Sequence, residues 1–373
     1  MKSPENFTLY RDRKLVEKVA EKIREAAGGE SFKFMHVCGT HEDTISRFAL
    51  RSILPENVKV IAGPGCPVCV TPPEVISAAI ELSKLDNVIL TTYGDMAHVP
   101  SPRGSLVQAR AKGGDVHIVY SIMDAVKLAN KRKDKQIVHF AIGFETTAPS
   151  TAATLLNNPP ENFSVLTYHL LIPPAIDFLL SLGEVKLDGF ILPGHVSTII
   201  GSNAYKYISE KWHIPQVVAG FEPLDVLVGI YMLLKQIREG RTEVENEYVR
   251  AVRPEGNVKA KEMMKRVFDV VDARWRGIGT IPCSGFKLKK EFENFDASKK
   301  FEITFEEFKQ DLHPGCKCGE ILRGLAQPED CPLFAKVCTP LHPIGPCMVS
   351  REGTCAIVYK YSRSKNKKAH FPP

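Results

Sequence analysis

The ten cysteines are the residues that most directly suggest chemistry in this sequence of 373 residues. Six of them are concentrated near the C-terminus, and the others are spread over the rest of the chain. The concentrated ones are Cys316, Cys318, Cys331, Cys338, Cys347 and Cys355, and the remaining ones are Cys38, Cys66, Cys69 and Cys283. In a reducing compartment so many thiols are rarely structural disulfides, so we expect metal or redox chemistry. The distribution predicts two separate thiol systems.

The C-terminal cysteines begin with a C-x-C pattern, followed by intervals of 12, 6, 8 and 7 residues. These intervals match neither the ligand run of bacterial ferredoxins nor the paired C-x2-C of zinc ribbons. Six thiols in a proline-rich segment can nevertheless supply four ligands to a [4Fe-4S] cluster and leave two for a redox pair. Zinc is the alternative metal. Cys283 has no partner at metal-like spacing, and we expect a small buried residue there.

Cys66 and Cys69 form a C-x-x-C motif directly before an expected helix start at Thr71. Unpaired N–H groups at a helix start stabilise thiolate, so cysteines there are nucleophilic and readily form a reversible disulfide. The glycines on either side of Pro64 suggest that this turn is exposed. The motif could instead be half of a tetrahedral zinc site, with Cys38 and His41 as the other two ligands.

Strand-like and helix-like segments alternate over the first 240 residues, which predicts open parallel sheets covered by helices. Short runs rich in β-branched residues and bounded by Gly, Pro or Asp indicate the strands. These runs are 32–38, 58–63, 87–94, 116–121, 136–143, 163–170, 187–194 and 216–220. We expect helices at 14–27, after an N-cap at Thr71, at 224–239 and, with an amphipathic pattern, at 260–271.

The expected fold class is α/β, with two Rossmann-like parallel-sheet domains and a C-terminal loop-rich iron-sulfur domain. The polar, basic stretch 130–136 is the expected break between the two α/β units. The first domain would therefore be 1–130, carrying Cys38 and the Cys66/Cys69 motif, and the second would be 131–240. The alternation fades after Gly240, so residues 241–373 would form the third domain.

Polar, glycine-rich loops follow most of the expected strands, at the sheet edge where open α/β folds bind ligands. For any single loop, tight turns and helix caps are the simpler explanation, and His195 alone would more often be a structural histidine. Taken together with the thiols, the loops favour a site in a cleft between the two units. The candidates are Cys38, Thr40 and His41, residues 63–69, Asp95, Glu145, His195 and residues 220–223.

Charge and hydropathy argue against two classes of protein. A formal net charge of +6 over 373 residues is a weak field, so no nucleic-acid partner is implied. The longest apolar stretch, at 226–234, falls short of the roughly 18 residues that a membrane span needs. The N-terminal residues are charged from the start, unlike a signal peptide. We expect a cytoplasmic protein with no membrane partner.

Distinctive motifs occur in order along nearly the whole chain. They are CGTHE at 38–42, GPGCPVCVTP at 63–72, GFETTAP at 143–149, PGHVSTIIG at 193–201 and GFEPLD at 220–225, followed by CKCGEILRG, CPLF, CTP, GPCMVS and EGTC. With these motifs the sequence resembles the hydrogenase maturation protein HypD family. The resemblance implies two α/β domains and an iron-sulfur domain. It also implies action with the small chaperone HypC and with HypE, which supplies cyanide, in assembling the Fe(CN)2CO unit of [NiFe] hydrogenases.

The resemblance implies that Cys38 holds the iron transiently, together with a thiolate from HypC. Thiolate is a soft ligand that suits electron-rich iron carrying cyanide and carbon monoxide. His195 would be a nearby ligand or proton donor, and Cys66 with Cys69 would be an electron or thiol-exchange station. Further polar groups around this site would be Thr40, His41, Asp95 and Glu145.

The C-terminal cysteines are similar in arrangement to those of ferredoxin:thioredoxin reductase, in which the first cysteine of a C-x-C is a ligand and the second belongs to an adjacent disulfide. This similarity implies that Cys318 and Cys347 form a redox disulfide. The other four would be the [4Fe-4S] ligands, namely Cys316, Cys331, Cys338 and Cys355.

Two other functions remain open at this stage. One is a free-standing thiol-disulfide reductase in which a cluster supplies electrons to Cys66 and Cys69. The other is a metabolic α/β enzyme whose cluster is only structural. Cys38 separates the scaffold from the reductase, because a reductase needs only the C-x-x-C whereas an iron scaffold needs a further thiolate in the same cleft.

Overall fold

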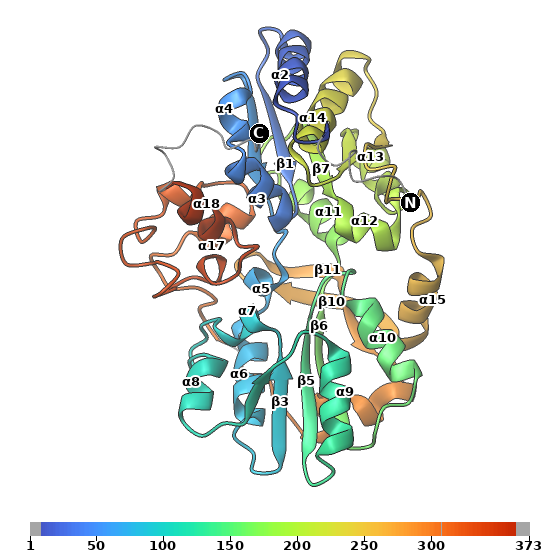
Figure 1. Ribbon diagram of the computed structural model, residues 1–373, viewed down its shortest axis with the longest axis vertical. Coiled ribbons are helices and arrows are strands. Elements are labelled where there is room, and N and C mark those ends of the chain that lie inside the picture. Colours follow the sequence, from blue (N-terminus) through green and yellow to red (C-terminus); the bar gives the residue numbers. More distant parts are fainter. Residues whose placement is uncertain (1–8, 307, 363–373) are drawn as a thin grey trace.

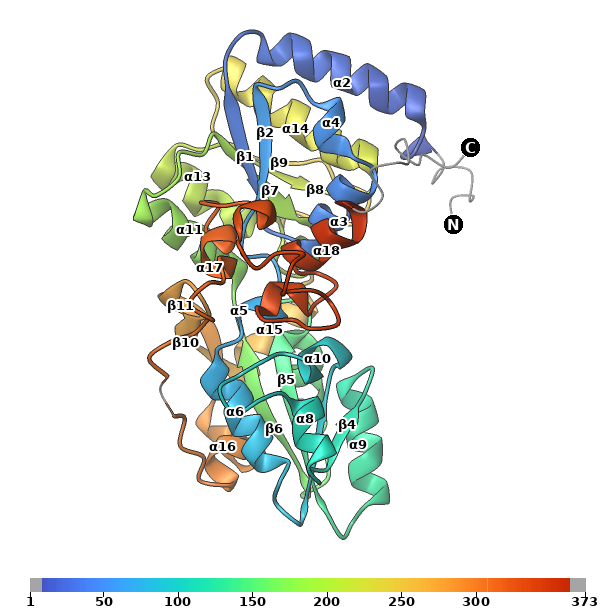
Figure 2. The ribbon, with the colours of Figure 1, turned by 90° about the vertical axis from the view of Figure 1, so that its left-hand side faces the viewer.

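The structure is a computed structural model that describes residues 9–306 and 308–362. Figure 1 shows two α/β lobes along the long axis, one around β1 (Phe32–His36) and β7 (Gly189–Pro193), the other around β3 (Val88–Thr92) and β5 (Gln136–Gly143). The C-terminal segment lies beside their junction, and Figure 2 shows it from the side. None of the described helices combines the length and the apolar character that a membrane crossing requires.

The first sheet has the strand order β2-β1-β7-β8-β9, and all neighbouring strands are parallel. Helices cover both faces of it, so its central strands are buried and almost entirely apolar. The other strands of this sheet are β2 (Val58–Ala62), β8 (Gln216–Ala219) and β9 (Val244–Asn246). The helices of this lobe are α2 (Arg13–Ala27), α3 (Gly39–Arg47), α4 (Leu50–Ile53), α11 (Ile172–Leu182), α12 (Gly194–Ile200), η1 (Ser202–Tyr205), α13 (Lys206–Trp212) and α14 (Pro223–Arg238).

The second sheet has the order β4-β3-β5-β6 and is also parallel throughout. Its outer strands are β4 (Val116–Ile118) and β6 (Phe163–His169). The helices of this lobe are α5 (Pro67–Val70), α6 (Pro73–Leu82), α7 (Gly94–Ala97), α8 (Leu106–Ala111), α9 (Ile122–Lys131) and α10 (Ala148–Leu156). The eight predicted strands are confirmed, and so is the helix at 14–27, which Asp12 caps.

The rest of the chain contains a helix, an antiparallel hairpin and a loop-rich end. The hairpin joins β10 (Phe268–Trp275) to β11 (Gly279–Leu288), and α15 (Val258–Val267) precedes it. The loop-rich C-terminal region is confirmed, and its short helices are η2 (Lys290–Phe295), α16 (Ala297–Lys300), α17 (Cys318–Leu322), η3 (Pro328–Asp330), η4 (Pro346–Met348) and α18 (Thr354–Ser362).

The two sheets do not follow the division expected at residue 130. Strand β1 pairs with β2 on one side and with β7 on the other, so the first lobe combines residues from both expected α/β units. Strands β3 to β6 form the second sheet as one insertion, and the stretch 130–136 lies inside it, between α9 and β5. Strand β9, beyond residue 240, belongs to the first sheet. The alternation of strands and helices predicts parallel sheets, but it does not specify which strands pair.

Two local predictions are wrong. Thr71 does not cap α6, because its hydroxyl donates to the carbonyl of Pro67 at 2.8 Å and it ends the preceding short helix α5. Pro72 precedes the first helical residue of α6 instead. The helix expected over 260–271 ends at Val267, and Val270 and Val271 lie in β10, where β-branched side chains are favourable.

One hydrophobic core joins the two lobes to the C-terminal segment. It contains Met35 of the first sheet, Phe140 of the second, Trp275 of the hairpin and Cys318 of the C-terminal segment. The hairpin is fixed to both neighbours through its backbone, because the N–H of Leu171 donates to Ser284 at 2.8 Å and that of Arg276 donates to Val70 at 2.8 Å. The lobes are therefore held together by packing as well as by the chain segments that pass between them.

Trp275 is a central residue of this shared core. Its indole is fully buried, stacks on Phe144 at 5.7 Å between ring centroids and donates to Ser284 Oγ at 2.9 Å. We expect Trp275→Ala to lower the free energy of unfolding by about 3–5 kcal/mol, through the cavity that it leaves and the lost hydrogen bond to Ser284. Chemical denaturation followed by circular dichroism measures the change.

Val270→Ala on the same hairpin is the matched control, since this side chain is 53% exposed. It should change the stability by no more than about 0.5 kcal/mol. If the two variants unfold at the same denaturant concentration, Trp275 does not join the lobes in the way described.

Candidate functional site

Cys38 lies directly after β1, at the start of α3, with an extended backbone. The loop after β2 contacts it through backbone atoms: the N–H of Gly39 donates to the carbonyl of Gly65 at 3.2 Å. A Cβ on Gly65 would lie 2.2 Å from the Cys38 nitrogen, so only glycine allows this approach. The parallel pairing of β1 with β2 therefore brings the Cys38 loop and the Cys66/Cys69 loop together.

The Cys38 thiol is free and only partly exposed. Burial raises its pKa to about 11, and the nearby carboxylate of Glu352 adds to this increase. The backbone N–H groups of His41 and Thr40 and the Thr40 hydroxyl act on this pKa in the opposite direction. The thiol is therefore protonated at neutral pH, and donors are already in place to stabilise a thiolate once a cation binds.

A buried ionic network fixes α3 under Cys38. Glu42 accepts hydrogen bonds from both terminal nitrogens of Arg51 at 2.7 Å, and its Oε2 lies 2.8 Å from His36 Nε2. Ser46 donates to the same carboxylate at 2.7 Å. Burial opposes the charge on Glu42, but the Arg51 guanidinium and the other donors hold the pKa of this carboxyl well below its usual range. The result is a fixed helix start behind Cys38.

His41 and His195 meet at the ring of Phe221, at the ends of β1, β7 and β8. His41 donates from Nε2 to the carbonyl of Gly220 at 2.9 Å, and burial lowers its pKa to about 3. His195 stacks on Phe221 at 3.9 Å between centroids and is exposed. Partial burial lowers the pKa of His195. Both imidazoles are therefore neutral at neutral pH, and only His195 is available to a ligand.

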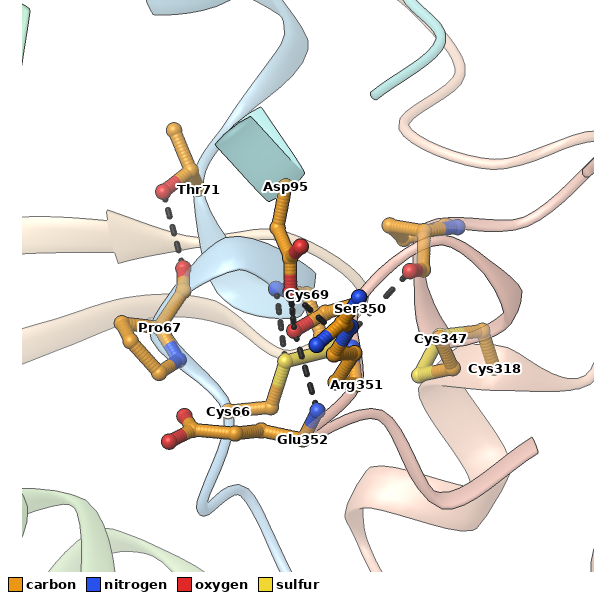
Figure 3. The surroundings of a disulfide bond; sticks show 11 residues. Cys66, Pro67, Cys69, Thr71, Asp95, Cys318, Cys347, Ser350, Arg351 and Glu352 are labelled. Atoms are coloured by element: carbon orange, nitrogen blue, oxygen red, sulfur yellow. Dashed lines mark hydrogen bonds between the residues drawn. A yellow bond between two sulfur atoms is a disulfide. The ribbon is translucent and has the colours of Figure 1, made fainter. Parts of the chain in front are cut away.

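Cys66 and Cys69 form a disulfide, with their Cα atoms 5.3 Å apart. Both are buried, at 3% and 0% exposure, so the expected exposed turn is wrong. The reason is that the C-terminal segment covers the turn, with Cys69 Sγ 3.9 Å from the carbonyl oxygen of Pro346 (Figure 3). The zinc alternative is not supported, because this pair is bonded to itself and His41 faces backbone carbonyls.

Cys318 and Cys347 form the second disulfide, and both are about 1% exposed. Pro346, which contacts Cys69, immediately precedes Cys347 in the chain. The two disulfides therefore lie close to each other, as Figure 3 shows. Their bonded state is a feature of the structure, whereas the redox role of each pair stays a prediction.

The four remaining C-terminal cysteines are free and lie near one another. Burial raises the pKa of Cys316 to about 11 and that of Cys355 well above its usual value, and in both cases the neighbouring thiols add to the increase. The backbone N–H of Ile344 donates to Cys338 Sγ at 3.4 Å. Gly345 is required here, since a Cβ on it would lie 2.5 Å from Cys316 Sγ.

Four free thiols are the number of protein ligands that a [4Fe-4S] cluster takes. Within residues 9–306 and 308–362, no three His, Cys, Asp or Glu side chains converge on a point where one metal ion would bind. A [4Fe-4S] cube instead takes one thiolate at each of four irons, so its ligands surround it at a distance from one another. The donor set fits the cube, with N–H groups to stabilise the thiolates.

Asp95 and Glu145, both singled out from the sequence, have different surroundings. Asp95 accepts from the Ser350 hydroxyl and the Arg351 N–H, each at 3.0 Å, and so fastens the C-terminal segment to the second lobe (Figure 3). Glu145 is buried, and one of its carboxyl oxygens has no partner among the described residues. Burial raises its pKa to about 8. Asp95 is therefore a structural anchor, and Glu145 is a buried neutral acid.

Sequence reasoning missed two residues of this site. Glu352 lies near the Cys38 thiol, and its backbone oxygen would be 2.3 Å from a Cβ on Gly39. Arg276 is a buried cation beside Cys316. Phe221, one of the candidates at 220–223, contacts the rings of both histidines. Only Glu352 carried a signal, since it opens the EGTC motif. Cys283 was expected to be buried but is exposed, in an outward position of the hairpin with φ 52°.

The comparisons with known proteins match the part of the chain that contains these motifs. Residues 14–362 match the family HypD, described as the hydrogenase formation hypA family. A putative hydrogenase expression/formation protein of Methanocaldococcus jannaschii is 50% identical over 94% of this chain and 98% of its own length. The hydrogenase maturation factors HypD2 of Bradyrhizobium diazoefficiens and HypD of Escherichia coli are 45% and 42% identical, each over 96% of this chain and at least 97% of their own. The chain belongs to the HypD family of hydrogenase maturation factors.

Proposed function

We propose that this protein is a redox-active scaffold on which the Fe(CN)2CO unit of [NiFe] hydrogenases is assembled in the cytoplasm. The observation that supports this most directly is the free thiol of Cys38, in backbone contact with the loop of a second, disulfide-bonded thiol pair. A thiolate retains iron that carries cyanide and carbon monoxide, because all of these ligands suit a soft metal. The iron is the substrate, and Cys38 is the residue that would hold it.

A partner must complete the coordination of iron held by one thiolate. We infer that a HypC-type chaperone supplies the second thiolate and that a HypE-type protein supplies cyanide, within a complex of the three. A groove of about 700 Å³ beside the Cys38 loop is lined by Gly39 and Thr40 on one side and by Met348 and Glu352 on the other. Such a groove gives a partner access to the iron site.

The resident cofactor of the proposal is a [4Fe-4S] cluster. Cys316, Cys331, Cys338 and Cys355 would hold it, and when bound it supplies one-electron transfer. The chain's own residues bury Cys331, Cys338 and Cys355, and the backbone N–H of Ile344 donates to the sulfur of Cys338. The buried guanidinium of Arg276 offsets part of the negative charge next to Cys316.

The two cysteine pairs would store reducing equivalents in their dithiol form, between the cluster residues and the iron site. Reduction of either bond takes two electrons and two protons and gives two thiols. The pair Cys318 and Cys347 lies on the side of the cluster residues, and the pair Cys66 and Cys69 lies beside Cys38. His195, which is exposed and stacks on Phe221, would act there as a ligand or a proton donor.

A thiol-disulfide reductase is the second candidate function. The contact between Cys69 and Pro346 would favour electron passage between the two disulfides in a scaffold and in a reductase alike. A reductase of protein targets must also present its attacking sulfur at the surface. Cys66 and Cys69 are buried beneath the C-terminal segment. Their position therefore favours action on a small species within the cleft, which is the scaffold.

We expect Cys38→Ala to abolish capture of the cyanide-bearing iron, because no other free thiol lies in that loop. Infrared spectroscopy on the protein isolated with its HypC-type and HypE-type partners should show the loss of the CN and CO stretching bands. The brown cluster absorbance should persist. Cys283→Ser is the control, since it removes an exposed thiol elsewhere and should leave the bands unchanged. Bands of full intensity in Cys38→Ala would exclude the ligand role.

Ala at Cys331 or Cys338 should remove the cluster absorbance and most of the bound iron, because a cube held by three thiolates is labile. Iron analysis and visible absorption of anaerobically isolated protein measure this. Cys38→Ala serves as the matched control and should keep both signals. If either ligand variant retains full iron content and an unchanged spectrum, the assignment of the four ligands is wrong.

Replacing both Cys66 and Cys69 by Ser should block hydrogenase maturation while the fold and the C-terminal cluster stay intact. The pair is expected to switch between disulfide and dithiol, which thiol titration with mass mapping at controlled redox potential detects. The redox role requires two results: the wild-type pair must change its state in the thiol titration, and the double variant must fail in the maturation assay. A fully active double variant, or a pair that never changes its state, would leave a structural turn only.

A further inference from the structure

The turn of the hairpin, residues 276–278, lies where the two thiol systems meet, and Figure 1 shows β10 and β11 between the lobes. The backbone N–H of Arg276 donates at 2.8 Å to the carbonyl of Val70, which directly follows the first disulfide in the sequence. A Cβ on Gly277 would lie 2.9 Å from the Cα of Gly319, which directly follows a cysteine of the second disulfide. The turn therefore contacts one residue beside each disulfide.

The side chain of Arg276 is 4% exposed, which is unusual for a charged residue. Its Nε donates to the backbone carbonyl of Asp311 at 2.8 Å, and a terminal nitrogen donates to that of Pro100 at 3.0 Å. Burial lowers its pKa to about 10, so the guanidinium still carries its positive charge at neutral pH. The two carbonyl groups fix the orientation of this cation, but they bring no negative charge to it.

The carboxylates that act on Arg276 through space pair with a different arginine. Asp311 and Glu74 both accept hydrogen bonds from Arg274, in the case of Glu74 Oε1 at 3.2 Å. Within the described part of the chain, no carboxylate forms an ion pair with Arg276 itself. A buried cation without a direct partner stabilises negative charge that forms near it.

The thiol of Cys316 is the group on which this charge acts. Burial raises the pKa of Cys316, and the guanidinium of Arg276 acts against the increase. Cys316 belongs to the group of four free C-terminal cysteines described above. Four thiolates outweigh the positive charge of an iron-sulfur core, so a cluster bound by them is an anion. An added electron makes it more negative, and a fixed positive charge nearby favours that addition.

We propose that Arg276 is a positioning residue whose charge raises the reduction potential of the group held by the four C-terminal cysteines. The inference rests on the proposed function, in which that group is a [4Fe-4S] cluster. The cluster gains one electron from an external reductant, and Arg276 stabilises the reduced form more than the oxidised form. The hairpin thus contributes a charge to the cluster as well as packing to the junction of the lobes.

The test compares Arg276→Gln and Arg276→Lys with the wild type, as full-length proteins isolated anaerobically. Glutamine keeps an amide donor but removes the charge, whereas lysine keeps the charge. Stepwise reduction with dithionite and redox mediators is followed by visible absorption and electron paramagnetic resonance. Arg276→Gln should lower the ratio of reduced to oxidised cluster at a fixed potential by about tenfold, a shift of about 59 mV for one electron. Arg276→Lys should stay close to the wild type.

Arg103→Gln is the matched control, because it removes a guanidinium that is partly exposed and paired with Glu306. Water and salt screen such a surface charge, so the potential should not change. The melting temperature of each variant shows whether it is folded. If Arg276→Gln does not fold or holds no cluster, Arg276→Lys decides, because a potential lowered by about tenfold in that ratio contradicts the role of the charge. Failure of both variants to fold would assign Arg276 to the junction alone and overturn the proposal.

Failure of the proposed function would look different. Wild-type protein without iron or cluster absorbance would refute the cluster assignment itself. A normal cluster with the same potential in Arg276→Gln and in the wild type would refute the role of Arg276 alone.

Discussion

Two backbone contacts that leave no room for a side chain determine where the thiols of this protein lie. At Gly65 the loop after β2 rests on the backbone of Cys38, and at Gly39 the C-terminal segment reaches the same loop through Glu352. A Cβ at either glycine would overlap backbone atoms at 2.2 or 2.3 Å. Three segments that are far apart in sequence can therefore converge on one cysteine.

The convergence also sets the electrostatics of the site. Each free cysteine in these groups with a resolved shift has a raised pKa, because the packing that brings the sulfurs together also removes them from water. The backbone and hydroxyl donors at Cys38 and the N–H groups at the C-terminal cysteines compensate only in part. Such thiols remain protonated until a cation arrives, so binding of a metal ion would release protons and depend on pH.

Much of this organisation could be predicted from the sequence, for a physical reason. Buried parallel strands need short β-branched runs, and these identified all eight strands of the N-terminal region. The candidate residues were expected in the loops after the strands, and the pairing of β1 with β2 brings the Cys38 loop and the Cys66/Cys69 loop to one edge of the sheet.

The predictions that were wrong concern features that depend on contacts between distant parts of the chain. The pairing of β1 with β7 leaves no trace in the local pattern, and so the domain boundaries were misplaced. The burial of Cys66 and Cys69 comes from the C-terminal segment rather than from their own turn. Cys283 faces solvent because of the irregular register of the hairpin, with β10 and β11 out of step between Val271 and Ala273.

The chain crosses between the lobes in a way that suits assembly on a small metal centre. The second lobe is inserted between β2 and β7 of the first, so each lobe contributes loops to the junction and neither can be removed from it. The C-terminal segment then closes one side, held by Asp95 of the second lobe and by Gly39 of the first. Both disulfides lie under this cover. A cover that depends on both lobes would loosen if the lobes moved apart, so access to the buried sulfurs is coupled to the arrangement of the whole molecule rather than to one mobile loop.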